Sequence, residues 1–176
     1  MSQLKPADLP RANPQRIICH WTAGAYKASP LDRKHYHFLI EGDGNIIRGI
    51  HNIADNDLTT DGDYAAHTLK CNTKSIGLSV CCMAGATRTN HGRYPMNERQ
   101  WRRMAEVAAQ LCKHYQIGVT PKTVLGHFEV QSALGIPQRG KWDPGLLPWA
   151  PDLDERAVGK CFRDLVLDTV SRETAP

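Results

Sequence analysis

The chain has 176 residues, a length that suits one compact domain with a substantial hydrophobic core. Its 41% hydrophobic and 23% charged residues are ordinary for a globular protein. The 22 Lys and Arg residues exceed the 18 Asp and Glu residues by a formal net charge of +4, an excess too small to indicate nucleic-acid binding.

Targeting and membrane signals are missing from the sequence. No stretch approaches the roughly 20 apolar residues that cross a bilayer, so no membrane insertion is expected. Residues 1–14 are polar, hold three prolines and lack the apolar centre of a secretory signal. We expect a flexible N-terminal arm over these residues, and synthesis in the cytoplasm. The six cysteines are then expected to be mostly free thiols, although later oxidation of one pair outside the cytoplasm stays open.

Apolar and β-branched runs predict five strands, at residues 16–20, 36–40, 46–50, 75–82 and 119–125. The second and third flank the Gly- and Asp-rich segment 41–45 and are expected to form a hairpin. Residues 75–82 are apolar on both faces, which favours a central strand. The last strand is expected to end at His127.

The clearest predicted helix runs from about Glu98 to Tyr115. Asn97 is a good N-cap, and Gln100 three residues later completes a capping box. Apolar residues recur along this segment at three- and four-residue spacing and form one stripe. Three arginines are expected on the opposite, solvent-facing side: Arg99, Arg102 and Arg103.

Two further helices are predicted nearer the C-terminus. A short helix is expected to end at residues 131–134, stopped by Gly135 and Pro137. The last helix starts near Asp154 and should dock on the sheet or on the long helix. Its expected core face consists of Val158, Cys161, Phe162, Leu165 and Val166.

The mixture of strands and helices indicates an α/β fold: a single domain over residues 15–172, with a central mixed β-sheet flanked by helices. Two long polar connections, residues 52–74 and 84–96, interrupt these elements. Loops of that length inside a compact domain are usually functional.

Three residues of the types that bind metals stand out. His20 and His127 each end an apolar run, and Asp143 follows Lys141 by two positions. Two His and one carboxylate leave one position of a tetrahedral zinc open for water, which is typical of catalytic rather than structural zinc sites. Taken singly, each has a plainer explanation: a His at a strand end is more often structural, and an Asp before Pro is usually a turn residue.

The combination resembles the zinc-dependent N-acetylmuramoyl-L-alanine amidases of the type-2 amidase and peptidoglycan-recognition-protein superfamily. The resemblance covers residues 16–149. It rests on the following motifs in the family's order: Ile18-Cys19-His20-Trp21-Thr22-Ala23-Gly24, Tyr36-His37-Phe38-Leu39-Ile40 with Asp43-Gly44, Ala66-His67-Thr68, Asn72, Ser75-Ile76-Gly77-Leu78, Gly126-His127 and Lys141-Trp142-Asp143-Pro144-Gly145. No single motif would suffice.

The resemblance implies a role for several positions. It makes His20, His127 and Asp143 the ligands of a Zn²⁺ cofactor and Lys141 a catalytic residue. Tyr36 looks like the catalytic Tyr of the phage lysozyme-type branch. Three further residues are candidates for the substrate groove: His67, Thr22 and Trp142. Plainer alternatives are a solvated turn for Lys141, strand packing for Tyr36 and packing for Trp142, which we prefer for Trp142 to stacking on a sugar.

One position departs from part of the family. The cytosolic branch that recycles muropeptides has a catalytic Glu after the Ser-Ile-Gly-Ile motif, and this chain has Ser79 there. The chain is therefore more similar to the lytic, phage-type branch, and the identity of the general base stays open.

The resemblance implies cleavage of the amide between N-acetylmuramic acid and L-Ala of peptidoglycan, by an enzyme acting on the cell wall after release or delivery. Two bacteriolytic settings stay open: a phage endolysin, or an antibacterial effector whose partner would be an immunity protein. Alternatives are a non-catalytic peptidoglycan-binding module and a recycling amidase. A monomer is expected, with no nucleic-acid partner.

Overall fold

A five-stranded sheet organises residues 4–174, the part of the chain that the computed structural model describes. The strands are β1 (Arg16–Trp21), β2 (Phe38–Ile40), β3 (Ile46–Arg48), β4 (Ser75–Val80) and β5 (Val124–Gly126). Their order across the sheet is β3-β2-β4-β1-β5, and only the β2–β3 pair is antiparallel. The expected α/β domain with a mixed sheet is confirmed, and β4 is the central strand, as its apolar composition predicted.

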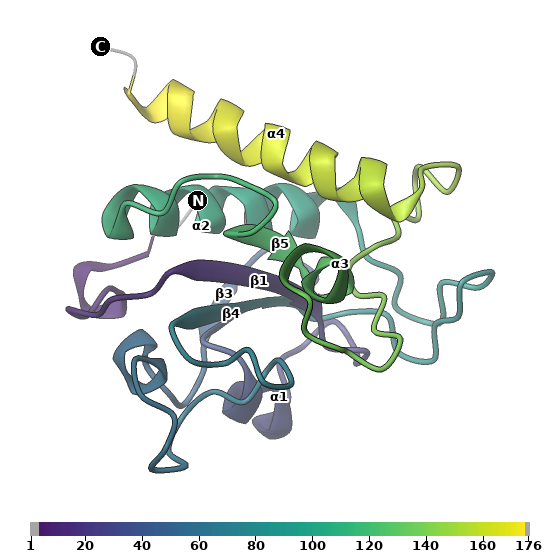
Figure 1. Ribbon diagram of the computed structural model, residues 1–176. Coiled ribbons are helices and arrows are strands. Elements are labelled where there is room, and N and C mark those ends of the chain that lie inside the picture. The colour runs from purple at the N-terminus through teal and green to yellow at the C-terminus, as the bar shows by residue number, and fades with distance from the viewer. Residues whose placement is uncertain (1–3, 175–176) are drawn as a thin grey trace.

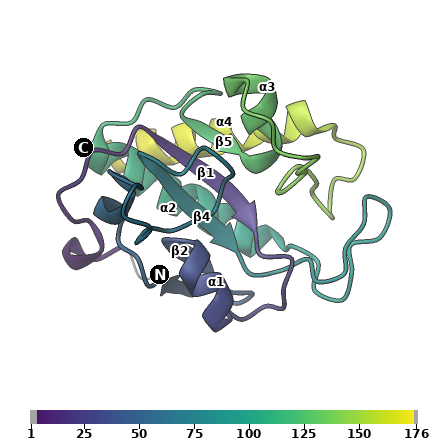
Figure 2. The same cartoon turned by 60° about the horizontal axis from the view of Figure 1, so that its bottom comes forward.

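Helices cover both faces of this sheet (Figure 1). The long helix α2 (Glu98–Tyr115) lies on one face, and α4 (Glu155–Thr174) packs across α2 as an outer layer. The short helices α1 (Pro30–His35) and α3 (Val130–Leu134) lie on the other side, as the turned view shows (Figure 2). Three 3-10 helices complete the fold: η1 (Pro6–Asp8), η2 (Ile53–Asn56) and η3 (His127–Glu129).

The two faces of the sheet differ in chemistry. On β1, Ile17 and Cys19 belong to the main hydrophobic core beneath α2 and α4. Ile18 belongs to a small second cluster on the opposite face, together with Leu125 and Val130. Since side chains alternate along a strand, His20 also points to this second face. The thick apolar layer therefore supports the sheet from one side and leaves the other side for polar groups.

Helix α2 begins as its capping sequence predicts. The Asn97 side chain accepts a hydrogen bond from the Gln100 backbone N–H, and the Gln100 side chain accepts one from the Asn97 N–H. The prediction that Arg103 faces solvent is wrong, because this residue is only 4% exposed and its guanidinium binds Glu106 at 2.5 Å. Helix α2 lies between the sheet and α4, so the arc that it buries is wider than one stripe.

Helix α4 docks on α2, as expected, and also contacts β5. Val158, Phe162 and Val166 are buried against the core. Cys161 is exposed, so its predicted place on the core face is wrong. All six cysteines are free thiols, and five of them are buried.

Helix α1 is absent from the sequence-based prediction. Ser29 caps it in a capping box with Asp32, and Pro30 occupies its first turn. The helix ends at Tyr36, so the strand predicted for residues 36–40 shortens to β2. The predicted strand 119–125 likewise shortens to β5, and His127 begins η3 instead of ending a strand.

The N-terminal residues that the structure describes lie against the domain. The backbone N–H of Leu4 donates to Gln110 Oε1 at 3.0 Å, and the Tyr115 hydroxyl donates to the Pro10 carbonyl at 2.8 Å. Arg48 binds Asp8 at 3.2 Å. Among residues 4–174, no helix combines the length and the apolar composition that a membrane crossing requires.

A buried ion pair ties α4 to the segment that carries His127. Arg163 Nη1 lies 2.9 Å from Glu129 Oε2, and the same oxygen accepts the backbone N–H of Gly126 at 2.9 Å. Gly159 on α4 faces the Glu129 carboxylate so closely that a Cβ would collide with it. This glycine therefore allows the helix to approach η3.

Replacing Gly159 with alanine is expected to destabilise the protein, although Gly to Ala in a helix normally stabilises by about 1 kcal/mol. Forcing a methyl group into this contact should cost about 1–3 kcal/mol through overpacking. Urea denaturation measures the change. Gly118→Ala is the matched control, because nothing lies within 4 Å of that Cβ. Equal or higher stability of Gly159→Ala would show that the contact is not tight.

Candidate metal centre

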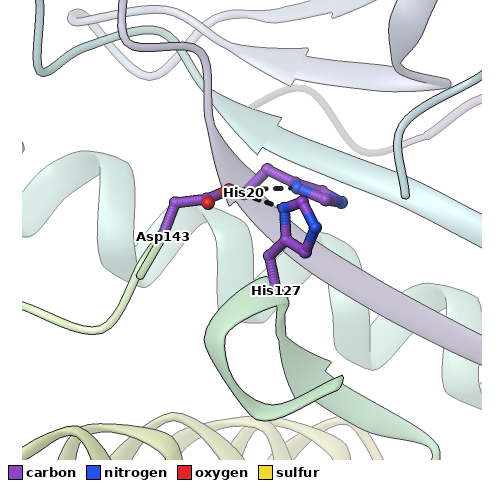
Figure 3. Close-up of side chains that lie close together, drawn as sticks. All are labelled: His20, His127 and Asp143. Carbon is purple, nitrogen blue, oxygen red and sulfur yellow. Dashed lines mark hydrogen bonds and ion pairs between the residues drawn. The ribbon is translucent and has the colours of Figure 1, made fainter. Parts of the chain in front are cut away.

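His20, His127 and Asp143 meet at the carboxyl ends of two neighbouring parallel strands. His20 is the next-to-last residue of β1, and His127 directly follows β5, its parallel partner. Asp143 comes from the connection between α3 and α4, and its carboxylate points at both imidazoles (Figure 3). Open α/β sheets commonly bind ligands at this edge.

The spacing of the three side chains fits a metal ion. The Nδ1 atoms of His20 and His127 lie 3.1 and 3.2 Å from the same Asp143 oxygen, Oδ2. Around a tetrahedral Zn²⁺ with bonds of about 2.0–2.1 Å, neighbouring ligand atoms lie about 3.3 Å apart. Two imidazole nitrogens and one carboxylate also form a donor set that zinc favours, with a fourth position left open.

Burial and hydrogen bonding set the charges of His20 and Asp143. All three residues are buried: the exposed fraction is 0% for His20, 4% for His127 and 7% for Asp143. Burial lowers the pKa of His20 to about 4, so its imidazole is neutral near pH 7. Burial alone would raise the pKa of Asp143, but hydrogen bonds with His127 and His20 outweigh it and hold that pKa below its usual range. A neutral imidazole and an ionised carboxylate are the forms that bind metals.

His67 lies behind His20 and fixes its ring. The Ser75 carbonyl oxygen can only accept a hydrogen bond, and it lies 3.3 Å from His67 Nε2. The proton of the His67 imidazole is therefore on Nε2. Burial, followed by the nearby His20, lowers the pKa of His67, which keeps the ring neutral and its Nδ1 an acceptor. This Nδ1 lies 2.8 Å from the Thr68 hydroxyl and 3.2 Å from His20 Nε2. With a metal on Nδ1 of His20, the remaining proton on Nε2 would face two acceptors, His67 Nδ1 and the Thr68 hydroxyl at 3.4 Å.

The connection 52–74, predicted to be functional from its length, holds His67 in position. Asn72 Oδ1 accepts the backbone N–H groups of His67 and Thr68 at 3.0 and 2.8 Å. The Asn56 amide in turn donates to the carbonyls of Asn72 and Ala65, both at 3.0 Å. The side chains of these two asparagines therefore fix the conformation of the connection that follows η2 (Ile53–Asn56).

Gly77 of β4 makes room for the His67 ring. A Cβ at this position would lie 2.6 Å from both Cγ and Cδ2 of His67. The backbone N–H of Gly77 also donates to His37 Nδ1 at 2.9 Å, so His37 is a structural partner of the strand. The glycine of the Ser75–Leu78 motif is therefore required by the imidazole that packs on it.

Replacing Gly77 with alanine is expected to displace His67 and weaken metal binding as well as the fold. Overpacking a buried strand should cost about 1–3 kcal/mol of folding free energy. Urea denaturation and the zinc content after dialysis measure the two effects. Gly118→Ala again serves as the control for a Gly-to-Ala change in open space. Unchanged stability and zinc content would contradict the packing of His67 on Gly77.

The other predicted residues surround the three ligands. Tyr36 ends α1, with its ring centroid 5.1 Å from that of His20. Burial, followed by the charge of Asp143, raises the pKa of Tyr36, so the phenol keeps its proton and can donate a hydrogen bond. Lys141 is exposed and lines a groove of about 670 Å³ together with His67 and His127.

Thr22 is held by hydrogen bonds, and Trp142 packs against another ring. The Thr22 hydroxyl accepts the backbone N–H groups of Gly24 and Cys82 at 3.1 and 3.3 Å. The Trp142 ring packs edge-on against Trp21, with centroids 4.6 Å apart. These contacts account for both side chains locally and agree with the packing explanation preferred for Trp142.

Ser79 and Gln138 complete the surroundings. Ser79 is fully buried in β4 in register with His20, so both side chains share one face of the sheet. Gln138 is buried, and its Oε1 lies 2.9 Å from His127 Nε2. Sequence reasoning missed Gln138, because a glutamine in a loop carries no recognisable signal.

The chain is similar in sequence to a known family and in fold to solved structures. A family model described as N-acetylmuramoyl-L-alanine amidase matches residues 10–146. No curated protein sequence matches the chain. The chain is similar in structure to the Ph2119 endolysin from the Thermus scotoductus MAT2119 bacteriophage Ph2119, with 17% identity, a TM-score of 0.54, and coverage of 92% of this chain and 88% of that one. At this identity the likeness shows the fold.

Two further solved structures are similar to the chain, with somewhat lower TM-scores. The amidase LysC from Clostridium intestinale URNW is 18% identical, with a TM-score of 0.49 over 78% of this chain and 81% of that one. A selenomethionine AmpD derivative is 20% identical, with a TM-score of 0.48 over 93% and 88% of the two chains.

Proposed function

The chain belongs to the N-acetylmuramoyl-L-alanine amidase family, and on this premise we propose that it uses Zn²⁺ to hydrolyse the amide bond between N-acetylmuramic acid and L-Ala of peptidoglycan. The single observation that carries the proposal is the buried cluster of His20, His127 and Asp143 beside an open groove. A buried carboxylate shared by two imidazoles, with one ligand position left over, is the arrangement of a catalytic zinc site.

The protein's own groups supply the remaining chemistry. A Zn²⁺ ion bound to the three side chains would act as the Lewis acid that polarises the scissile carbonyl and activates water. The Tyr36 phenol keeps its proton because burial raises its pKa, so it can donate a hydrogen bond to the carbonyl oxygen as negative charge develops there. Its closeness to the His20 ring supports this role.

Lys141 is the second candidate for stabilising the developing negative charge. It precedes Asp143 by two residues in the same connection between α3 and α4. Lys141 lines the groove together with His127, which supports a place beside the reacting carbonyl. The ammonium group would bind the developing oxyanion, and this electrostatic stabilisation is often the largest single contribution to catalysis.

We propose a bacteriolytic setting for this activity. Ser79 occupies the position of the catalytic Glu that characterises the recycling branch, and a serine hydroxyl does not replace a carboxylate as a general base. An endolysin and a delivered antibacterial effector both fit, and the effector would require an immunity protein as its partner.

Digestion of purified peptidoglycan sacculi tests the bond that is cut. The proposed amidase releases stem peptides with a free N-terminal L-Ala and leaves glycan strands without peptides, which mass spectrometry identifies. New reducing sugar ends would show cleavage of the glycan instead. Binding to sacculi without any released peptide would favour the non-catalytic recognition module.

A further inference from the structure

Gln138 connects His127 to Leu69, and all three residues line the groove. The residue is 3% exposed and lies in the connection between α3 and Lys141. Its side-chain Oε1 is 2.9 Å from His127 Nε2, and its side-chain Nε2 donates to the Leu69 carbonyl at 2.9 Å. The amide therefore joins the loop that carries Lys141, the loop that carries His67, and the imidazole between them.

The hydrogen bonds define which way this amide points. Carbonyl oxygens can only accept, so the NH₂ group of Gln138 must face Leu69 and Ile136, at 2.9 and 3.3 Å. Its oxygen is then directed at His127 Nε2, whose proton it would accept once a metal occupies Nδ1. The Gln138 backbone is held as well, since its N–H donates to Gln131 Oε1 of α3 at 3.1 Å.

We propose that Gln138 is a positioning residue that holds the His127 imidazole with its proton on Nε2 and its Nδ1 free for the metal. The inference rests on the proposed zinc site. Nδ1 is the nitrogen that faces Asp143 Oδ2, at 3.2 Å, so the other tautomer, with its proton on Nδ1, would present that proton to the ion. A hydrogen bond to the second nitrogen of a metal-bound His typically contributes 10- to 100-fold in metal affinity.

Two substitutions separate this role from a purely structural one. Gln138→Met keeps the length of the side chain but removes both the acceptor and the donor. Gln138→Glu keeps an oxygen acceptor for His127 but loses the donor to Leu69 and Ile136. If the acceptor matters, zinc binding should weaken about 10- to 100-fold in the Met variant and stay within about threefold of wild type in the Glu variant.

Competition with a chromophoric zinc chelator measures these affinities, and melting of the metal-free proteins shows whether each variant folds. Equal weakening in both variants would overturn the proposal, because loss of the hydrogen bond from Gln138 to the Leu69 carbonyl would then explain the effect. Unchanged affinity in the Met variant would overturn it too. Failure of the wild type to bind zinc would instead remove the proposed function, and this inference with it.

A second measurement does not depend on substitutions. Nitrogen-15 NMR of the imidazole rings in the zinc-loaded wild type distinguishes a protonated from a metal-bound nitrogen. The proposal requires His127 to bind through Nδ1 and to carry its proton on Nε2. A His127 bound through Nε2, with the proton on Nδ1, would overturn it even if the Met variant did not fold.

Discussion

Replacing Asp143 with alanine is expected to abolish zinc retention and amide hydrolysis together. The change removes the only anionic ligand of the cluster formed by His20, His127 and Asp143. Two imidazoles, which carry no negative charge, would remain around a doubly charged ion in a buried site. The affinity should therefore fall by more than the roughly 100-fold that loss of an outer hydrogen-bond partner costs. Zinc content after dialysis and peptide release from sacculi measure the two effects.

Asp152→Ala is the matched control for this experiment. Asp152 is an exposed carboxylate in the same connection between α3 and α4, so its loss changes the net charge equally. Its zinc content and turnover should equal those of wild type. An Asp143→Ala protein that keeps stoichiometric zinc or full turnover would remove Asp143 from the ligand set.

Replacing Lys141 with alanine is expected to preserve zinc but to lose most of the turnover. Lys141 is exposed in the groove and belongs to no hydrogen bond of the ligand cluster, so the fold and the metal should be little affected. Removing one group that stabilises an oxyanion typically lowers kcat by about 10²- to 10³-fold. The expected loss therefore falls on kcat rather than on zinc affinity, and steady-state kinetics with a soluble muropeptide separates kcat from KM.

Lys70→Ala removes the same charge from the same groove and controls for a general electrostatic effect. This control should keep kcat within a few-fold of wild type. Full activity in Lys141→Ala would refute its catalytic role. Equal losses in both variants would show that the groove needs positive charge and that no particular lysine acts on the reacting carbonyl.

The ligand set was predictable from sequence, whereas the groups that orient it were not. His20, His127 and Asp143 are residue types with distinctive chemistry in recognisable motifs, and the structure brings them together. The contact between Gln138 and Leu69 joins positions 69 residues apart through one amide. No periodicity or spacing encodes such a contact, because it depends on how two irregular loops meet.

The errors in the predicted elements have physical causes. The sequence of α2 predicts a single apolar stripe with the arginines opposite it. The helix is covered by the sheet and also by α4, so a wider arc is buried and Arg103 lies within that arc. Helix α1 was missed although Ser29 and Asp32 form a capping box, because six residues are too few to show helical periodicity. Cys161 fits the apolar spacing of α4 but lies at the edge of its buried face.

We propose that the buried cluster of two histidines and one aspartate binds the zinc on which the amidase activity depends. The most direct measurement is a titration of the metal-free protein with Zn²⁺, with L-Ala-terminated stem peptides released from sacculi as the readout. Peptide release should rise linearly and level off at about one equivalent of zinc, and a chelator should abolish it. Full release by the metal-free protein in the presence of chelator would contradict the claim.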